Sequence, residues 1–502
     1  MIRARTLGAV LAGVTSVAMS VAMAVSLAVG PAASSPAAPA GVAAPTHRVV
    51  SAEQQQDIAD EVRALPGVSS VTEATAPAGY RFFQITFTQP VDHKHHKRGT
   101  FEQRLTLLHK DVSRPMVMST GGYYVSQNPG RSEPTRIVDG NQLSMEYRFF
   151  EPSRPDDPDW RKQLTIWQAA TDQHRIITSF KRLYQQNWIT TGGSKGGMTA
   201  TYHRRFYAGD VDGTVPYVAP NDVDNDRDEY NRFLARVGTD PECRAAITAV
   251  QRRILGPERA WFLQRTRTAA EGAGLTWDIL GSLDRGMEVA AVDLYFTFWQ
   301  YTPQSGCANV PGPEATNDEI WAWTQGVVPL TGYLDQDLTF FLPYWYQAAY
   351  QLGWYEPYEQ PLRGVLRHPG AFAAPEFVPG ELRPIRFDKG AMRDVDHWVR
   401  TRSTRMLYVY GGNDPWGAEP FSCGTKQVIP RQCSVHVVEG GTHGANIAQL
   451  PTAERDSATA RVLEWAGLPA SDPAVRQITR TGKPAAVPAL DRPAERVLRG
   501  GL

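Results

Sequence analysis

The chain has 502 residues, of which 42% are hydrophobic and 21% are charged, values that are ordinary for a globular protein. This length allows one large domain with insertions or two to three smaller domains. The 52 basic and 52 acidic residues give a formal net charge of zero. The chain therefore lacks the excess of basic residues that is typical of nucleic-acid-binding proteins, and we expect no nucleic-acid partner.

The first 40 residues have the composition of a secretory signal peptide. Arg3 and Arg5 precede an uncharged stretch from Leu7 to Val29, and small residues with proline follow as far as Ala44. A retained membrane anchor is the alternative, since the apolar run approaches the ~20 residues that span a bilayer. The small-residue zone and the lack of a later apolar run of that length favour cleavage. We therefore expect a secreted, extracellular monomer without stable membrane association.

Two alternating stretches, 80–87 and 100–108, predict a pair of strands. The turn between them carries His93, His95 and His96. Three histidines this close allow a metal site, but the lysines and the arginine among them repel a cation, and a polar hairpin turn explains the composition. We expect no metal and no cofactor.

Strands and helices then alternate along the chain. Residues 115–120 form a short apolar run, and 142–150 is expected to be a further strand with Glu146 and Arg148 on the same face. A long amphipathic helix over 161–184 follows, because apolar residues recur there near helical spacing.

The stretch 192–196 reads Gly-Gly-Ser-Lys-Gly, a Gly-x-Ser-x-Gly pattern centred on Ser194. An apolar strand at 187–191 precedes it, and a helix at 198–207 follows. A serine between a strand and a helix, flanked by glycines, is the nucleophile elbow of an α/β-hydrolase. The strand–helix alternation around it predicts the parallel sheet of that α/β fold. For the motif alone, a glycine-rich surface turn is the alternative.

The same fold predicts an oxyanion hole built from two backbone N–H groups. Lys195, the residue after the nucleophile, would supply one of them. Gly122, in the glycine turn that ends the 115–120 strand, would supply the other, because glycine lets the backbone approach a substrate oxygen. A plain strand-ending turn is the alternative for Gly122.

After a strand at 213–220, the regular alternation stops. From 221 to 396, helical stretches rich in aromatic residues replace it. An insertion of this size after the nucleophile segment predicts a large, mainly helical cap domain, whose aromatic residues mostly form its own core. The chain is accordingly divided into hydrolase segments 41–220 and 397–480, the cap 221–396, and a tail at 481–502.

Two later strands, 404–410 and 433–438, each end in a glycine-rich turn that carries a polar side chain. Asp414 follows the first strand and His443 follows the second. Acyl transfer by a serine needs a base to take the Oγ proton and a carboxylate to orient that base. In this fold the three residues occur in the chain order Ser, Asp, His, which Ser194 completes.

Other residues compete for two of these catalytic roles. Asp222 and Asp224 are rival acids because they also follow a strand, and His436 is a rival base that lies within a strand. Taken singly, Asp414 is also compatible with a strand-capping turn and His443 with a surface loop. The joint agreement with the nucleophile elbow favours the triad.

The four cysteines fit an exported protein and fall into sequential pairs, Cys243 with Cys307 and Cys423 with Cys433. Four cysteines allow three pairings. The sequential pairing is favoured, because each disulfide then lies within one segment of the chain. No Cys-x-x-Cys motif is present, so a zinc or redox site is weakly supported.

Several motifs together resemble the secreted bacterial prolyl tri/tetrapeptidyl aminopeptidases, a serine peptidase family related to the lysosomal prolyl carboxypeptidase and dipeptidyl peptidase group. The resemblance covers most of the mature chain, and its motifs are Gln89-Pro90-Val91-Asp92-His93, Phe101-Glu102-Gln103-Arg104, Glu146-Tyr147-Arg148-Phe149-Phe150, the helix from Leu164 to Asp172 and the elbow from Gly192 to Met198. Lys195 stands where the related group has an aromatic residue, and this departure points to the bacterial family.

The resemblance implies that Ser194 is the nucleophile, Asp414 the orienting acid and His443 the general base. It also implies peptide substrates that are cleaved after proline, with release of tri- or tetrapeptides from a free N-terminus. A secreted esterase or lipase of the same fold is the alternative function. A non-catalytic binding protein of this fold is less compatible with a complete triad.

Substrate recognition by such an enzyme sets further requirements. A proline pocket should be apolar and aromatic, because the proline ring offers no donor. A cap over the cleft would limit the distance from the N-terminus to the scissile bond. An acidic group should hold the substrate ammonium, and Glu146 is our candidate, with pairing to Arg148 or Arg104 as the structural alternative.

Overall fold

The computed structural model describes residues 57–223, 228–426 and 428–469. The expected signal peptide, the tail at 481–502 and the rival acid Asp224 lie outside the described residues. Within these ranges, no helix is long and apolar enough to cross a membrane.

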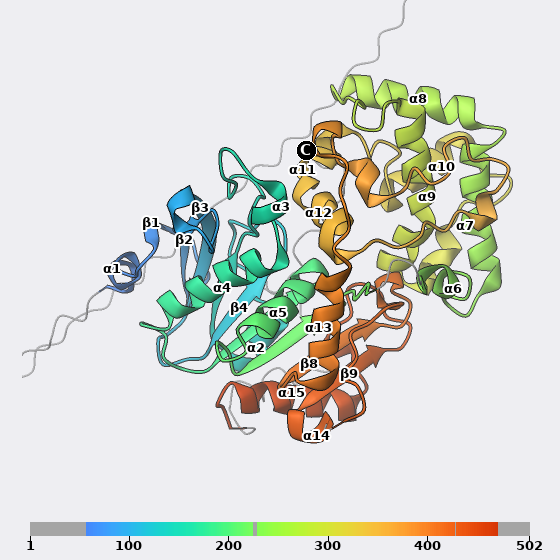
Figure 1. Ribbon diagram of the computed structural model, residues 1–502. Helices are drawn as coiled ribbons and strands as arrows, with labels where there is room; N and C mark the ends of the chain where they lie inside the picture. Colours follow the sequence, from blue (N-terminus) through green and yellow to red (C-terminus); the bar gives the residue numbers. More distant parts are fainter. Residues whose placement is uncertain (1–56, 224–227, 427, 470–502) are drawn as a thin grey trace, which may run out of the picture. The chain divides into compact units, whose positions relative to one another are not determined.

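A single mixed sheet runs through the described chain (Figure 1). Its order is β1-β2-β3-β5-β4-β6-β7-β8-β9, antiparallel across β1, β2, β3 and β5 and parallel from there to β9. The strands are β1 (Val68–Ala74), β2 (Arg81–Pro90), β3 (Thr100–His109), β4 (Met116–Thr120), β5 (Asn141–Met145), β6 (Trp188–Gly193), β7 (Gly213–Tyr217), β8 (Met406–Gly411) and β9 (Cys433–Val438). The exchanged positions of β4 and β5, the parallel strands after them and the serine turn after β6 confirm the α/β-hydrolase fold.

Helices cover both faces of this sheet (Figure 1). On one face lie α4 (Ile166–Phe180), α5 (Lys195–Phe206) and α13 (Lys389–Thr401), and on the other lie α2 (Glu133–Val138) and α15 (Thr452–Trp465). Successive strand residues point to opposite faces, so alternate apolar side chains of one strand join different clusters. The central strands β4 to β8 are therefore buried along almost their whole length, as expected for a sheet that is covered on both faces.

A helical region separates β7 from β8 in the chain. It contains α6 (Tyr230–Leu234), α7 (Pro241–Leu255), α8 (Arg259–Gly272), α9 (Leu283–Tyr301), α10 (Asn317–Val327), α11 (Asp335–Phe340) and α12 (Leu342–Gln347). Most of its aromatic side chains join one buried cluster around α9. The expected boundary at residue 396 falls inside α13, whose buried face packs against β8, so this helix belongs to the layer on the sheet.

Three local expectations differ from the structure. The expected strand at 142–150 ends at Met145; beyond it, the Glu146 side chain bonds to Arg104 of β3 and the Arg148 side chain turns to Asp172 of α4. The expected helix at 161–184 is divided into α3 (Trp160–Gln163) and α4, and Thr165 between them caps α4 by accepting a hydrogen bond from the Gln168 N–H. Strand β1 and helix α14 (Val428–Arg431) were not expected; helix α1 (Ile58–Arg63) precedes β1.

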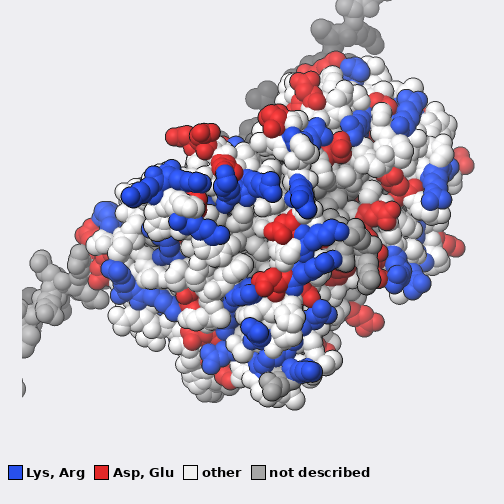
Figure 2. Space-filling view, in the orientation of Figure 1, with Lys and Arg blue, Asp and Glu red and all other residues white. Residues whose placement is uncertain are grey.

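Both disulfides follow the sequential pairing. Cys243 of α7 is bonded to Cys307, which follows α9, and Cys423 is bonded to Cys433 at the start of β9. This pairing confirms the expectation from the cysteine positions. On the face drawn in Figure 2, basic and acidic side chains are interspersed, in agreement with the formal charge of zero.

Candidate active site

The turn at Ser194 is strained in the way that a nucleophile elbow requires. Strand β6 ends at Gly193, α5 begins at Lys195, and Ser194 between them has φ 56° and ψ −129°. Such a backbone is costly for a residue with a side chain and is found where surrounding structure holds it. A Cβ on Gly192 or Gly196 would overlap the Thr120 carbonyl oxygen, so glycine is needed at both positions. The strain and the glycines match the local pattern expected from the sequence.

Asp414 and His443 are paired. The His443 Nδ1 lies 2.7 Å from the Asp414 Oδ2, and the Asp414 side chain is completely buried. Asp414 also accepts a hydrogen bond from the Trp416 N–H in the turn after β8. The other ring nitrogen, Nε2 of His443, is buried and has no hydrogen-bond partner among the described residues. A histidine with one nitrogen held by a carboxylate and the other unoccupied has the arrangement of a general base.

The three candidate residues follow β6, β8 and β9, which are parallel. The carboxyl ends of parallel strands meet at one edge of a sheet, so Ser194, Asp414 and His443 share that edge. The structure thus joins Asp414 to His443 directly and places Ser194 on the same side of the sheet.

The helical region reaches this edge through the end of α9. The His443 N–H donates to the Gln300 carbonyl oxygen at 2.8 Å, and the Tyr301 ring meets the His443 ring edge to face at 5.9 Å. Trp416, two residues after Asp414, packs against Phe296 of α9. These contacts were not predicted, because no local motif links α9 to the turn after β9.

The glycine turn after β4 packs directly on the elbow. Gly122 has φ 75°, and a Cβ there would lie 2.7 Å from the Lys195 carbonyl carbon, so glycine alone allows this approach. The Gly122 N–H donates to the Thr120 hydroxyl at 3.1 Å. The Lys195 Nζ donates to the Gly122 carbonyl at 2.6 Å. The two residues expected to form the oxyanion hole are therefore in contact.

Glu146, the candidate for holding the substrate ammonium, lies in a buried hydrogen-bonded cluster. Its side chain is completely buried, and its carboxylate accepts hydrogen bonds from Arg104, from the Val125 N–H and from Ser153. Burial raises the pKa of this carboxyl group above its usual value, although the bond from Arg104 opposes the change. The alternative of pairing with Arg104 is the one that the structure contains.

The rival residues have other partners or surroundings. His436 lies in β9 and contacts Glu454 and Ser434. Asp222 is buried near Gly353, in the segment that follows β7. In the described part of the chain, the carboxylate that contacts His443 is that of Asp414.

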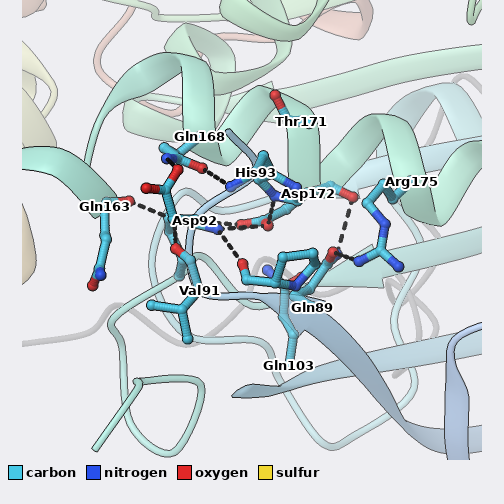
Figure 3. Close-up of polar contacts among 12 residues, drawn as sticks. Gln89, Val91, Asp92, His93, Gln103, Gln163, Gln168, Thr171, Asp172 and Arg175 are labelled. Carbon is cyan, nitrogen blue, oxygen red and sulfur yellow. Dashed lines mark hydrogen bonds and ion pairs between the residues drawn. The ribbon is translucent and has the colours of Figure 1, made fainter. Parts of the chain in front are cut away.

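The histidines of the β2–β3 turn bind carboxylates of the protein. The His93 Nε2 lies 2.6 Å from the Asp172 Oδ1 of α4, as Figure 3 shows. The His95 Nδ1 lies 2.9 Å from the Asp92 Oδ2. Gln168 joins the two groups, since its side chain contacts the His93 N–H and the Asp92 carboxylate. This network ties the turn to α4 and accounts for the polar composition of the turn.

Comparison with known proteins agrees with this geometry. A family described as PS-10 peptidase S37 matches residues 52–491. The chain belongs to this peptidase family. It is 50% identical over 433 residues to a prolyl tri/tetrapeptidyl aminopeptidase of Streptomyces mobaraensis. The aligned region covers 86% of this chain and 89% of that protein. The chain is thus a serine peptidase.

Likeness to solved structures is more distant. A proline iminopeptidase of Mycobacterium smegmatis is 14% identical, with a TM-score of 0.32, over 79% of this chain and 99% of that one. The rice cell wall degrading esterase LipA of Xanthomonas oryzae is 11% identical, with a TM-score of 0.32, over 79% of this chain and 97% of that one.

Proposed function

We propose that this protein is a secreted prolyl tri/tetrapeptidyl aminopeptidase that works through an acyl-enzyme on Ser194. The observation that carries the proposal is the Asp414–His443 pair at the same sheet edge as the strained Ser194 turn. The 50% identity to a relative of that name supports the substrate class. The disulfides and the signal-like first 40 residues support secretion.

In the proposed reaction, the His443 Nε2 takes the proton from the Ser194 hydroxyl as the oxygen attacks the carbonyl carbon of the substrate proline. Asp414 holds the ring through Nδ1 and stabilises the imidazolium that forms. The same histidine then gives the proton to the leaving amine. Water, activated in the same way, releases the short peptide and restores Ser194.

The oxyanion of the tetrahedral intermediate would accept hydrogen bonds from the backbone of Lys195 and from the Gly122 turn. The Gly122 N–H bonds to Thr120 in the structure, so a substrate oxygen would share or replace that bond. The helical region is proposed to act as a cap: the contact of α9 with His443 places its end at the active site and supports a limit on substrate length.

The test uses Ser194→Ala and a set of substrates. Wild-type protein should cleave Ala-Pro-Ala-Pro-type chromogenic peptides with a free N-terminus, and Ser194→Ala should lose roughly 10⁴-fold or more in kcat without loss of folding. Mass spectrometry of products from graded proline peptides would show whether three or four residues are released. High turnover of nitrophenyl esters with no peptide cleavage would instead assign an esterase, and full activity of Ser194→Ala would reject the nucleophile.

A further inference from the structure

The side chain of Lys195 occupies an unusual place for a lysine. It follows the nucleophile directly, is almost completely buried, and ends 3.2 Å from the ring centroid of Tyr147. Tyr123 and Phe150 lie at 5.5 and 5.8 Å on other sides of the ammonium group. A cation over several aromatic faces is stabilised by their quadrupoles, although the burial of a charge is costly.

This lysine has no acidic partner: none of the ion pairs found in the described ranges involves it. Its polar contact is instead the 2.6 Å hydrogen bond to the Gly122 carbonyl oxygen. Burial lowers the pKa of the Lys195 amine well below its usual value. A methionine or a leucine would fill such a cage at lower cost, so packing does not explain the amine.

The group that the amine holds is the turn beside the nucleophile. Gly122 is in the left-handed region with φ 75°. Because glycine is permissive, its backbone alone would allow many other orientations of the adjoining peptides. The turn is tied at the Gly122 N–H by Thr120 and at the Tyr123 carbonyl by the Tyr147 N–H. The bond from Lys195 fixes the peptide plane that lies between these two points.

A trans peptide is planar, with its C=O and N–H pointing in opposite directions. Fixing the Gly122 carbonyl therefore fixes the direction of the Tyr123 N–H in the same peptide. It also restricts rotation at the Gly122 Cα, which joins this peptide to the preceding one that carries the Gly122 N–H. We propose that Lys195 is a positioning residue: its side chain holds the Gly122–Tyr123 peptide and, through the Gly122 Cα, the adjoining Gly122 N–H in the orientation that oxyanion stabilisation requires. The proposal rests on acyl transfer by Ser194, as proposed above.

The test is Lys195→Met, which keeps the length and apolar volume but removes the donor. We expect kcat to fall roughly 10- to 100-fold, with KM changed less than about threefold, because the bond acts on the transition state. This loss of kcat should be smaller than the roughly 10²- to 10³-fold loss that follows removal of a direct oxyanion donor. The thermal midpoint should not fall, since the cage stays filled. Active sites are counted by the final amplitude of labelling with a fluorophosphonate, so kcat refers to folded enzyme.

Tyr147→Phe is the matched control. It keeps the ring under the lysine and removes only the hydroxyl, which accepts a bond from Gln347 at 2.9 Å. We expect it to keep kcat per titrated site within about threefold of wild type even where its stability falls. If Lys195→Met does not accumulate as folded protein, Lys195→Gln replaces it. The glutamine side chain is one bond shorter than lysine, so its amide does not reach the Gly122 oxygen, and we expect the same loss of kcat.

Two results would overturn the proposal: an unchanged kcat per titrated site with a lower thermal midpoint, which assigns a structural role, or a raised KM with unchanged kcat, which assigns substrate binding. Peptides and nitrophenyl esters are both measured, because any acyl transfer uses the oxyanion hole. If the proposed substrate class is wrong, the wild-type protein will fail to cleave the peptides. If only the role of Lys195 is wrong, the wild-type protein will cleave them and the Lys195 variants will not show the expected loss of kcat.

Discussion

At the scale of single residues, the contact with Asp414 orients the His443 ring and favours one of its tautomers. The buried Asp414 carboxylate lies 2.7 Å from Nδ1 and so favours the tautomer that leaves Nε2 as the acceptor for the Ser194 proton. Asp414→Asn keeps the size but presents an amide, which favours the wrong tautomer. We expect kcat to fall about 10⁴-fold with little change in KM or in the thermal midpoint, measured by steady-state kinetics on a prolyl peptide.

The rival acid provides the comparison for this prediction. Asp222→Asn alters a buried carboxylate that also follows a parallel strand, without touching the Asp414–His443 contact. We expect kcat per titrated site to stay within about tenfold of wild type. A loss in Asp222→Asn as large as that in Asp414→Asn would place the orienting acid elsewhere.

The candidate site residues that the sequence could suggest are those with a local signal. Ser194, Asp414 and His443 each lie in a glycine-rich turn at the end of an apolar strand, so motif and chain order suffice to select them. The partner of Glu146 could not be chosen from the sequence, because Arg104 is 42 residues away along the chain, on the strand β3 that pairs with β5. The contact of Gln300 with His443 likewise depends on how α9 ends against the sheet, which no local pattern encodes.

At the scale of elements, several strands that are buried on both faces were predictable from their apolar residues. The elbow and the helix after it were predictable from the glycines around Ser194. The end of β5 was not predictable, because residues 146–150 keep the alternation of a strand although Arg148 bonds to Asp172 of α4 instead of following the sheet. Strand β1 was missed because four of its seven residues are exposed, and so its apolar pattern is weak. Helix α3 was merged with α4 because Thr165 resembles an interior residue until its capping bond is seen.

The disulfides permit a prediction at the same scale. The Cys243–Cys307 bond joins residues 64 apart, and the Cys423–Cys433 bond joins residues 10 apart. A longer closed loop restricts the unfolded chain more, so removal of the first bond should cost about 4 kcal/mol of unfolding free energy and removal of the second about 3 kcal/mol. The double variants Cys243→Ala/Cys307→Ala and Cys423→Ala/Cys433→Ala are compared by urea denaturation. A larger loss in the second pair would contradict the loop-length argument.

At the scale of the whole molecule, polar groups join the helices that cover one face of the sheet. The Asp210 Oδ2 lies 2.8 Å from His174 of α4 and 2.9 Å from His203 of α5. Burial opposes ionisation of Asp210, but the two histidine bonds outweigh it and lower the pKa of Asp210 to about 2. The stability of the fold therefore depends on this carboxylate remaining ionised.

The sign of the resulting pH dependence follows from the lowered pKa. Because the folded protein holds the Asp210 proton more weakly than the unfolded chain, the stabilisation is complete above about pH 5 and is lost as pH falls toward 2. A decrease from 3.8 to about 2 corresponds to about 2 kcal/mol. Asp210→Asn should therefore be less stable than wild type by about 2 kcal/mol at pH 6, and the difference should shrink toward zero near pH 2.

Urea unfolding of wild type and Asp210→Asn between pH 2 and 6 measures this difference directly. Asp157→Asn, at an exposed position, is the matched control and should change stability by less than about 0.5 kcal/mol at any pH. Since both aspartate variants remove one potential negative charge, their comparison separates the bonds to His174 and His203 from general charge effects. A difference for Asp210→Asn that stays constant or grows as the pH falls would show that its carboxylate does not stabilise the fold through ionisation.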